Sequence, residues 1–436
     1  MYICSNCQTE YAKWQGKCDS CNEWSSIEEN PNFVDKKKGK KSKSLGKPDI
    51  VKPVKFSELS NNDSKTPSFE IKTKISEFDN TLGGRILPGQ VILLAGAPGI
   101  GKSTLSLEAV ENLSKQNLNI LYITGEESPT QIKNRADRLK LKLVNVSFFP
   151  EMNVNAIRNY VASNRSKIDF IIVDSIQTLY SPNVTSTTGS VSQISESTNE
   201  LVNLAKGFSI PTIIIGHITK SGDIAGPKIL EHMVDTVLYF EGDKKYNLRI
   251  LRVKKNRFGP TDEVGIFKMT EDGLKEIKDT KELFDPSKQS EPGSVFSMVL
   301  EGNRSVVVEV QALATKTYFS IPRRTASGFE LNRLHLLLAV IDKKLHLKTQ
   351  EYDIYVNITG GIKVKDPGLD FAVLWAIISS IKNIQVPRQN IFFGEVGLTG
   401  EIRKVIMQEN REKEAKRLGF TSLMTNKVIK NVKELK

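Results

Sequence analysis

A glycine-rich segment between an apolar run and an amphipathic stretch constrains this chain more than any other feature. Its sequence is GAPGIGKST, which fits the pattern G-x-x-x-x-G-K-[ST]. The run QVILLAG at 90–96 predicts a buried strand, and residues 102–116 predict a helix. In this order the elements form a phosphate-binding loop, because glycines let backbone N–H groups surround phosphates at a helix N-terminus. The segment therefore predicts a nucleotide site.

Individual side chains of the phosphate-binding loop have separate expected roles. Lys102 is expected to reach the β- and γ-phosphates of ATP, and Ser103 to bind Mg²⁺. The apolar part of a later run, DFIIVDSIQ, ends at Asp174, whose carboxylate can hold the same Mg²⁺ through water. The predicted nucleotide-binding residues are Gly96, Ala97, Pro98, Gly99, Ile100, Gly101, Lys102, Ser103 and Thr104.

A carboxylate and an imidazole follow two other predicted strands. Glu126, in the segment ITGEES, can orient the attacking water, and Glu127 is the alternative. Acidic residues are also common where helices begin, so a structural role for this pair stays open. His217 ends the run PTIIIGH, where it can sense the γ-phosphate or serve as a packed or capping residue. Polar segments after Asp174 and after His217 can contact a ligand or form surface loops.

All four cysteines of the chain lie in its first 21 residues, with the spacing C-x₂-C-x₁₀-C-x₂-C. Four thiolates at this spacing can hold Zn²⁺ in a closed, structural, tetrahedral site. So short a segment has little core, so metal binding would supply its folding energy. Two tryptophans of the segment, Trp14 and Trp24, can pack the ribbon or stack on bases. The predicted zinc ligands are Cys4, Cys7, Cys18 and Cys21.

The rest of the chain divides by its patterning. From about residue 60, short apolar runs alternate with amphipathic stretches, which predicts an α/β core with a largely parallel sheet. A polar segment containing Pro and Gly, TKELFDPSKQSEPGS, predicts a boundary before a second, α+β domain. The predicted parts are a zinc ribbon at 1–30, a basic flexible linker at 31–59, an ATPase core at 60–285 and a C-terminal domain at 286–436.

The charge of the chain favours a polyanionic partner. The formal net charge is +12. The fractions of hydrophobic residues (39%) and charged residues (26%) are those of an ordinary globular protein. Nucleic acid or an anionic membrane surface would suit that charge. The lysine-rich stretch DKKKGKKSKSLGK can be a plain tether or touch phosphates. No apolar run approaches the ~18 residues of a membrane span, and the N-terminus lacks a signal-peptide pattern, so the cytoplasm is the predicted location.

One short stretch carries more cations than a strand end needs. In VKKNRFGP, Lys254, Lys255 and Arg257 end a predicted strand, and Gly259 and Pro260 then turn the chain. Solvation of a strand end explains one or two of these charges. Three cations on an element that fixes their direction suggest a role in a site.

These motifs together resemble the bacterial RadA (Sms) DNA repair proteins. The resemblance rests on the cysteine ribbon, GAPGIGKST, GEES, VDSIQT, GHITKSGDIAGPKILEHMVD and KNRFG, and on EGNRSVVVEVQAL, DIYVNITGGIKVKDPGLDFAV and FGEVGLTGEIRKV. It implies a RecA-like ATPase core between the zinc ribbon and a Lon-protease-like domain. It also implies a hexameric ring of DNA-dependent ATPase subunits. Such a ring would drive branch migration on single-stranded and branched DNA with a RecA-type recombinase.

The resemblance assigns the cations of KNRFG. In head-to-tail rings each ATP lies at a subunit boundary, so Lys255 and Arg257 would reach the γ-phosphate of the neighbouring subunit. The alternative is a RecA-fold ATPase that switches protein assembly without moving along DNA. An ATP-dependent protease is the third possibility, and the C-terminal domain speaks against it.

Active Lon-type proteases use a serine nucleophile and a lysine base. The resemblance places Gly368 at the serine position, or Leu369 after a one-residue shift. It places Arg411 at the lysine position, with Lys413 nearby, and arginine does not deprotonate in proteins. The domain is therefore predicted to be proteolytically inactive and kept for assembly and DNA contact. Its basic stretch can face phosphates or be a solvated face; the cations are Arg323, Arg324 and Arg333.

Overall fold

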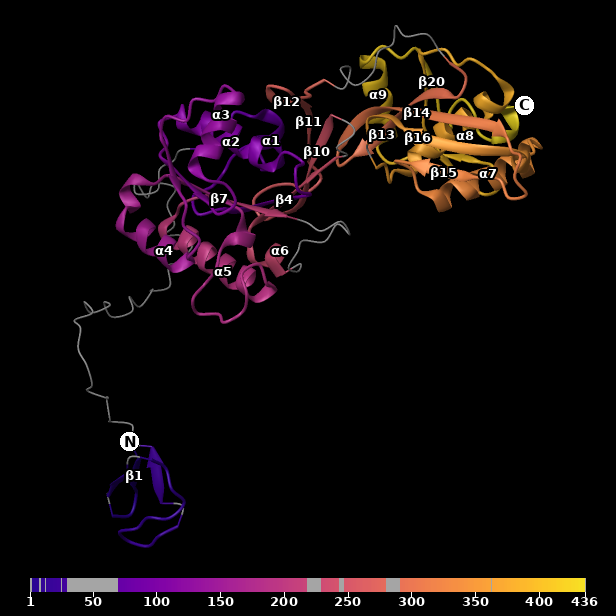
Figure 1. Ribbon diagram of the computed structural model, residues 1–436. Helices are drawn as coiled ribbons and strands as arrows, with labels where there is room; N and C mark the ends of the chain where they lie inside the picture. Colours follow the sequence, from indigo (N-terminus) through magenta and orange to yellow (C-terminus); the bar gives the residue numbers. More distant parts are fainter. Residues whose placement is uncertain are drawn as a thin grey trace, which may run out of the picture. The chain divides into compact units, whose positions relative to one another are not determined.

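The computed structural model forms two compact units, Met1–Lys65 and Thr66–Lys436, which are described separately (Figure 1). The predicted linker at 31–59 lies outside the described residues. Among the residues that are described, no helix has the length and apolar character needed to cross a membrane. The structure describes residues 2–7, 9–11, 13–24, 26–29, 70–217, 229–242, 247–279, 291–361 and 363–435.

The N-terminal unit contains a small antiparallel sheet in the order β2-β1-β3, formed by β1 (Tyr2–Cys4), β2 (Glu10–Tyr11) and β3 (Ile27–Glu29). Its buried cluster consists of Cys4, Cys18 and Ile27, so the thiols themselves fill the interior. Trp14 and Trp24 are 63% and 71% exposed. Neither ring belongs to the buried cluster, and Trp14 is held on the surface of the ribbon, where its Nε1 donates to the carbonyl oxygen of Ile27 at 3.2 Å.

The ATPase core is a nine-stranded sheet in the order β12-β11-β10-β9-β4-β8-β7-β5-β6. Its parallel strands are β4 (Val91–Gly96), β5 (Ile120–Thr124), β6 (Val146–Phe149), β7 (Phe170–Asp174), β8 (Thr212–His217) and β9 (Thr236–Glu241). An antiparallel extension follows, with β10 (Leu248–Asn256), β11 (Val264–Thr270) and β12 (Gly273–Glu276). Nearly continuous burial along β4, β5 and β7 agrees with apolar runs covered on both faces.

Helices cover both faces of this sheet (Figure 1). One face packs against α1 (Ser76–Thr81), α2 (Lys102–Ser114) and α3 (Pro129–Arg138). The other packs against α4 (Val154–Ser163), α5 (Val191–Phe208) and α6 (Ile229–Met233). Two 3₁₀ turns, η2 (Arg165–Lys167) and η3 (Ile176–Thr178), flank β7. The predicted α/β architecture is confirmed.

The C-terminal part is α+β, as predicted, with a six-stranded mixed sheet in the order β15-β16-β14-β13-β17-β20. These strands are β13 (Ser294–Glu301), β14 (Arg304–Lys316), β15 (Arg324–Ser327), β16 (Tyr352–Ile358), β17 (Asn390–Phe392) and β20 (Ser422–Met424). The strands β18 (Glu395–Val396) and β19 (Ile402–Arg403) form a separate pair. The helices are α7 (Leu331–Leu345), α8 (Asp370–Lys382) and α9 (Gln408–Arg417), with 3₁₀ turns η5 (Thr349–Glu351), η6 (Thr359–Gly361), η7 (Pro367–Leu369) and η8 (Val432–Leu435).

The ATPase core and the C-terminal domain share one hydrophobic cluster. Alternation along β10 sends Leu248 and Ile250 into the cluster that fills the C-terminal domain, and Leu251 into the core beside α2. An ion pair also joins the two parts, because Arg304 Nη1 lies 2.6 Å from Glu77 Oε2. The division predicted at residue 285 therefore does not coincide with a gap between cores.

Candidate ATP, zinc and C-terminal sites

The phosphate-binding loop connects β4 to α2, and its glycines have steric reasons. Gly99 and Gly101 have φ angles of 74° and 117°, which residues with a Cβ atom rarely adopt. A Cβ atom at Gly96 would lie 2.6 Å from the carbonyl oxygen of Phe240, and one at Gly101 would lie 2.7 Å from Met269 Cε. The glycine pattern therefore serves both the curl of the loop and its close approach to β9 and β11.

Lys102 is buried, and its ammonium group has three partners. Its Nζ donates to the carbonyl oxygens of Gly96 at 2.9 Å and Ala97 at 3.1 Å, and lies 3.0 Å from His217 Nδ1. Burial lowers the pKa of Lys102 to about 8. Since an ammonium only donates, Nδ1 of His217 must accept and Nε2 must carry the ring proton. Phosphate oxygens of a nucleotide can replace all three of these acceptors.

Glu126 is connected to Lys102 through His217. Its Oε1 lies 2.9 Å from His217 Nε2 and also accepts a hydrogen bond from the hydroxyl of Ser175. The hydrogen bond from His217 is the main reason that the pKa of Glu126 falls to about 2. The carboxylate is therefore ionised at neutral pH and suited to orienting a water molecule.

The alternative carboxylate, Glu127, is used elsewhere. It forms an ion pair with Arg135 of α3. Next to it, Ser128 caps α3, and the Ser128 and Gln131 side chains bond to each other's backbone N–H groups. The expected helix start is thus present, but it engages Glu127 and Ser128, whereas Glu126 faces Lys102 and His217.

Asp174 ends β7 next to the phosphate-binding loop. Tyr122 donates its hydroxyl proton to Asp174 Oδ2 at 2.7 Å, and the Ser103 hydroxyl lies close enough to this carboxylate to lower its pKa. Burial raises the pKa of Asp174, and the hydroxyls of Tyr122 and Ser103 oppose that rise. A hydroxyl and a carboxylate side by side are the hard oxygen donors that Mg²⁺ prefers. The residues at hand therefore fit the expected metal.

Sequence reasoning missed three residues near this site. Ser175 bonds to Glu126, Tyr122 orients Asp174, and Gln177 Nε2 donates to the carbonyl oxygen of His217 at 3.4 Å. Ser175 and Gln177 lie within three residues of Asp174, so the strand-end rule could have found them. Residues 218–228, the start of the polar segment after His217, lie outside the described residues.

The cations of KNRFG lie near the starts of the parallel strands, at the end opposite the phosphate-binding loop. On β10, Asn256 pairs with Thr236 at the start of β9, whereas Gly96 pairs with Phe240 near the end of β9. These positions are roughly 13 Å apart along β9, at about 3.3 Å per residue. Lys255 and Arg257 are therefore not brought together with Lys102, Glu126 and Asp174.

The two cations of this pair have different surroundings. Lys255 Nζ donates to the carbonyl oxygens of Glu231 in α6 at 2.6 Å and of Val234, just after α6, at 2.7 Å. Arg257 is half-exposed, and its contact with Asp235 is long, with 3.4 Å between Nη1 and Oδ1. Lys255 thus holds the backbone, and Arg257 is the one that can reach outward.

A tight turn fixes the direction of Arg257. Asn256 Oδ1 accepts from Thr236 Oγ1 and from the N–H of Phe258, both at 3.1 Å. A Cβ atom at Gly259 would lie 2.7 Å from Asn256 Nδ2 and 3.1 Å from Gly83 Cα. The glycine therefore lets the turn pack against the segment after α1.

The four cysteines converge as predicted. Their sulfur atoms all lie within 4.8 Å of one another, with 3.7 Å between Cys4 and Cys21 and 3.4 Å between Cys7 and Cys18. Tetrahedral zinc with Zn–S bonds of about 2.3 Å needs sulfur atoms about 3.8 Å apart. The thiols therefore fit Zn²⁺ in a closed site.

The two positions that correspond to the serine and the lysine of active Lon-type proteases lie side by side in the C-terminal domain. A Cβ atom at Gly368 would lie 2.6 Å from Arg411 Nη1. Arg411 is 1% exposed, pairs with Asp366 and donates to the carbonyl oxygens of Met298 and Ile406, both at 3.0 Å. Leu369, the shifted alternative, is fully buried, and Lys413 is exposed. The absence of protease activity stays a prediction.

The expectation that three arginines can face phosphates together is wrong for two of them. Arg324 donates to backbone carbonyl oxygens, including that of Thr349 at 2.8 Å. Arg333 binds Asp370 through two nitrogens and the carbonyl oxygen of Val396 at 3.0 Å. Of the three, only Arg323 is exposed, with its guanidinium 4.0 Å from the centre of the Phe319 ring.

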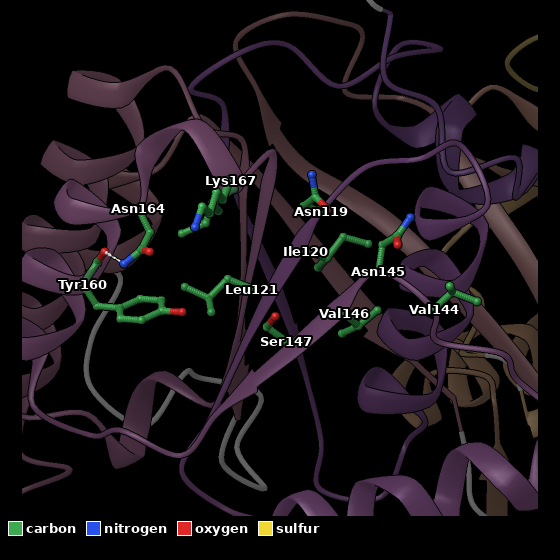
Figure 2. Close-up of a pocket in the computed structure, with 11 residues that line it drawn as sticks. Asn119, Ile120, Leu121, Val144, Asn145, Val146, Ser147, Tyr160, Asn164 and Lys167 are labelled. Atoms are coloured by element: carbon green, nitrogen blue, oxygen red, sulfur yellow. Dashed lines mark hydrogen bonds between the residues drawn. The ribbon is translucent and has the colours of Figure 1, made fainter.

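A polar hollow of about 270 Å³ lies away from all these residues (Figure 2). It opens at the starts of β5 and β6, which is the sheet edge opposite the phosphate-binding loop. Asn164 in its wall donates to the carbonyl oxygen of Tyr160 at 2.9 Å. The hollow is lined in part by Asn119, Asn145, Ser147, Tyr160, Asn164 and Lys167.

Two family models match the predicted modules. Residues 71–148 match the KaiC ATPase family, and residues 2–29 match a rubredoxin metal binding domain family. The RecA-like ATPase core and the N-terminal zinc ribbon are thereby confirmed. The relation of the C-terminal domain to Lon proteases stays a resemblance.

Similar proteins extend over nearly the whole chain. The DNA repair protein RadA of Aquifex aeolicus is 42% identical over 98% of this chain and 93% of its own length. Those of Bacillus subtilis and Campylobacter jejuni are 42% and 43% identical, over 97% and 99% of this chain and 91% and 95% of their own lengths. Among solved structures, the RadB recombinase has 22% identity and a TM-score of 0.38, covering 48% of this chain and 99% of its own.

Proposed function

The chain belongs to the RadA family of DNA repair proteins, and we propose that it is a DNA-dependent ATPase of homologous recombination. Its subunits would form a ring, hexameric by resemblance, that drives branch migration on single-stranded and branched DNA. A RecA-type recombinase would act on the same intermediates in the cytoplasm. One observation supports the ring: Arg257 and the phosphate-binding loop lie at opposite ends of the parallel strands of one sheet, so Arg257 can reach a nucleotide only in another subunit.

In the proposed reaction, Lys102 leaves its three present acceptors for the β- and γ-phosphates of ATP. Mg²⁺, held by Ser103 and Asp174, would neutralise charge on the phosphates. Glu126, kept ionised and oriented by His217 and Ser175, would align the attacking water. Arg257 of the neighbouring subunit would stabilise charge that develops on the γ-phosphate.

His217 would register the presence of nucleotide. Its Nδ1 accepts from Lys102 in the present structure, and it loses that donor when Lys102 turns to the phosphates. Its Nε2 holds Glu126, and its carbonyl oxygen accepts from Gln177. Movement of one imidazole ring would therefore change both the water-orienting carboxylate and the end of β8.

Binding to single-stranded DNA is supported by charge and by exposed rings. The net charge is +12, and Tyr318 and Phe319 are 95% and 51% exposed beside Arg323. Aromatic rings and arginine guanidinium groups are surfaces on which bases stack. Trp14 and Trp24 of the zinc ribbon offer the same chemistry.

The decisive experiment measures ATP turnover at fixed salt, first without nucleic acid and then with single-stranded DNA. Lys102→Ala provides the blank. We expect DNA to stimulate turnover, and the stimulation to decline steeply as salt rises, because phosphate contacts release counterions. The same rate of ATP turnover with and without DNA would contradict a DNA-dependent ATPase and favour an ATP-driven switch in protein assembly.

A further inference from the structure

A buried arginine on β10 touches the phosphate-binding loop from behind. Arg249 is 4% exposed, and its Nε donates to the carbonyl oxygen of Ile100 at 3.1 Å. Its Nη1 donates to the carbonyl oxygen of Leu248 at 2.8 Å. Burying a guanidinium is tolerated where its donors are used, and one of the acceptors here is a carbonyl oxygen of the phosphate-binding loop.

The chain makes room for this side chain. Gly242 has a φ of 151°, and a Cβ atom there would lie 2.8 Å from Arg249 Cδ and 2.6 Å from the carbonyl oxygen of Leu248. Alternation along β10 places Arg249 on the same face as Leu251 and Val253, toward the core beside α2. Strand and glycine together aim the guanidinium at the loop.

The contact has a geometric consequence for the loop. The peptide group that joins Ile100 to Gly101 is planar, and in a trans peptide its C=O and N–H bonds point in opposite directions. Arg249 holds the carbonyl oxygen on the β10 side, so the N–H of Gly101 points away from β10. Backbone N–H groups of such a loop are the donors that bind phosphates.

We propose that Arg249 is a positioning residue for ATP: it fixes the Ile100–Gly101 peptide so that the Gly101 N–H stays directed at the phosphates. This inference rests on the proposed ATP site. It also gives β10 a place in both sites of a ring. The strand would hold the phosphate-binding loop of its own subunit at Arg249 and present Arg257 to the next subunit, about 26 Å further along at 3.3 Å per residue.

The test measures the affinity of the full chain for a fluorescent, non-hydrolysable ATP analogue with Mg²⁺ and without DNA. We expect Arg249→Met to weaken binding about tenfold, the usual effect of one charge-assisted hydrogen bond. Arg249→Lys keeps one charged donor but not the fork of the guanidinium, so it should lose less affinity than Arg249→Met. The control is Arg252→Met, because Arg252 lies on the same strand but pairs with Glu241 and Glu301.

Two results would overturn the proposal. Arg249→Met could bind the analogue as tightly as Arg252→Met, or Arg249→Lys could lose as much affinity as Arg249→Met. If Arg249→Met does not fold, Arg249→Gln takes its place with the opposite expectation: its Nε2 stands where the arginine Nε stands, so it should keep the bond to Ile100 and bind the analogue within about threefold of the unchanged protein, and a tenfold loss would contradict the positioning role. Lys102→Ala separates the two levels: full affinity in that variant would contradict the ATP site itself, whatever Arg249 does.

Discussion

The phosphate-binding loop and the segment around Gly368 each set a buried cation against glycine and backbone carbonyls, yet they differ in what the cation can do. Lys102 has two carbonyl oxygens and a neutral imidazole as partners, all of which phosphate oxygens can replace. Arg411 is paired with the carboxylate of Asp366 and enclosed by backbone. A cation with neutral partners keeps its charge available for a ligand, whereas a neutralised one serves the fold.

The prediction with the largest expected effect tests whether the charge of Lys102 acts together with Arg257 of a neighbouring subunit. Each of Lys102→Ala and Arg257→Ala should lower DNA-stimulated turnover by about 10³-fold or more, as for other phosphate-binding lysines and arginine fingers. Mixed in equal amounts, the two variants should regain about a quarter of normal turnover in randomly assembled rings. One interface in four then has an intact loop facing an intact Arg257.

Turnover in the mixture is measured against each variant alone at the same total concentration. A mixture that stays at the level of the single variants would show that both residues must lie in one subunit. That result would contradict the neighbour role of Arg257 despite its distance from its own loop.

The second prediction concerns the neutralised cation. Arg411→Ala should lower the free energy of unfolding by roughly 3–5 kcal/mol, because it leaves Asp366 buried without its partner. Turnover per folded molecule should change little. Chemical denaturation followed by circular dichroism gives the first quantity, and an ATPase assay at low temperature gives the second.

Matched variants complete this measurement. Lys413→Ala, an exposed neighbour on α9, should stay within about 0.5 kcal/mol of the unchanged protein. Gly368→Ser should destabilise the fold and yield no proteolysis, since its Cβ atom meets Arg411. An Arg411→Ala protein of normal stability would show that the pair is not structural and would reopen the question of a ligand there.

The sequence predicted features whose cause is local. The glycine pattern of residues 96–104 and the cysteine spacing needed no knowledge of distant partners. Arg324 and Arg333 were misjudged because the groups that bind them, at Thr349 and Asp370, lie 25 and 37 residues away. A charge run records the number of cations and not which of them are already used.

Arg249 illustrates the opposite difficulty. In the segment YNLRILRV it is one of two arginines with the same strand spacing to apolar neighbours. Its role depends on a contact with Ile100, which is 149 residues earlier in the chain. The shared core of β10 and the C-terminal domain was hidden for the same reason, since both faces of that strand are apolar.

The smallest expected effect concerns the titration of Lys102. Its pKa is lowered to about 8 by burial, against the opposing charges of Asp174 and Glu126. Phosphates bind the charged ammonium, so the affinity for an ATP analogue should fall as pH rises through 8, by about tenfold between pH 7 and pH 9. Glu126, with a pKa of about 2, keeps its charge throughout this interval.

The control for this titration is Lys102→Arg, whose guanidinium does not deprotonate in this range. Its affinity, even if lower, should stay flat between pH 7 and pH 9. The same flat profile in the unchanged protein would mean that Lys102 is charged well above pH 8. The three neutral acceptors would then stabilise the ammonium by more than burial destabilises it. Lys102 and Arg411 would in that case differ only in the arrangement of their partners.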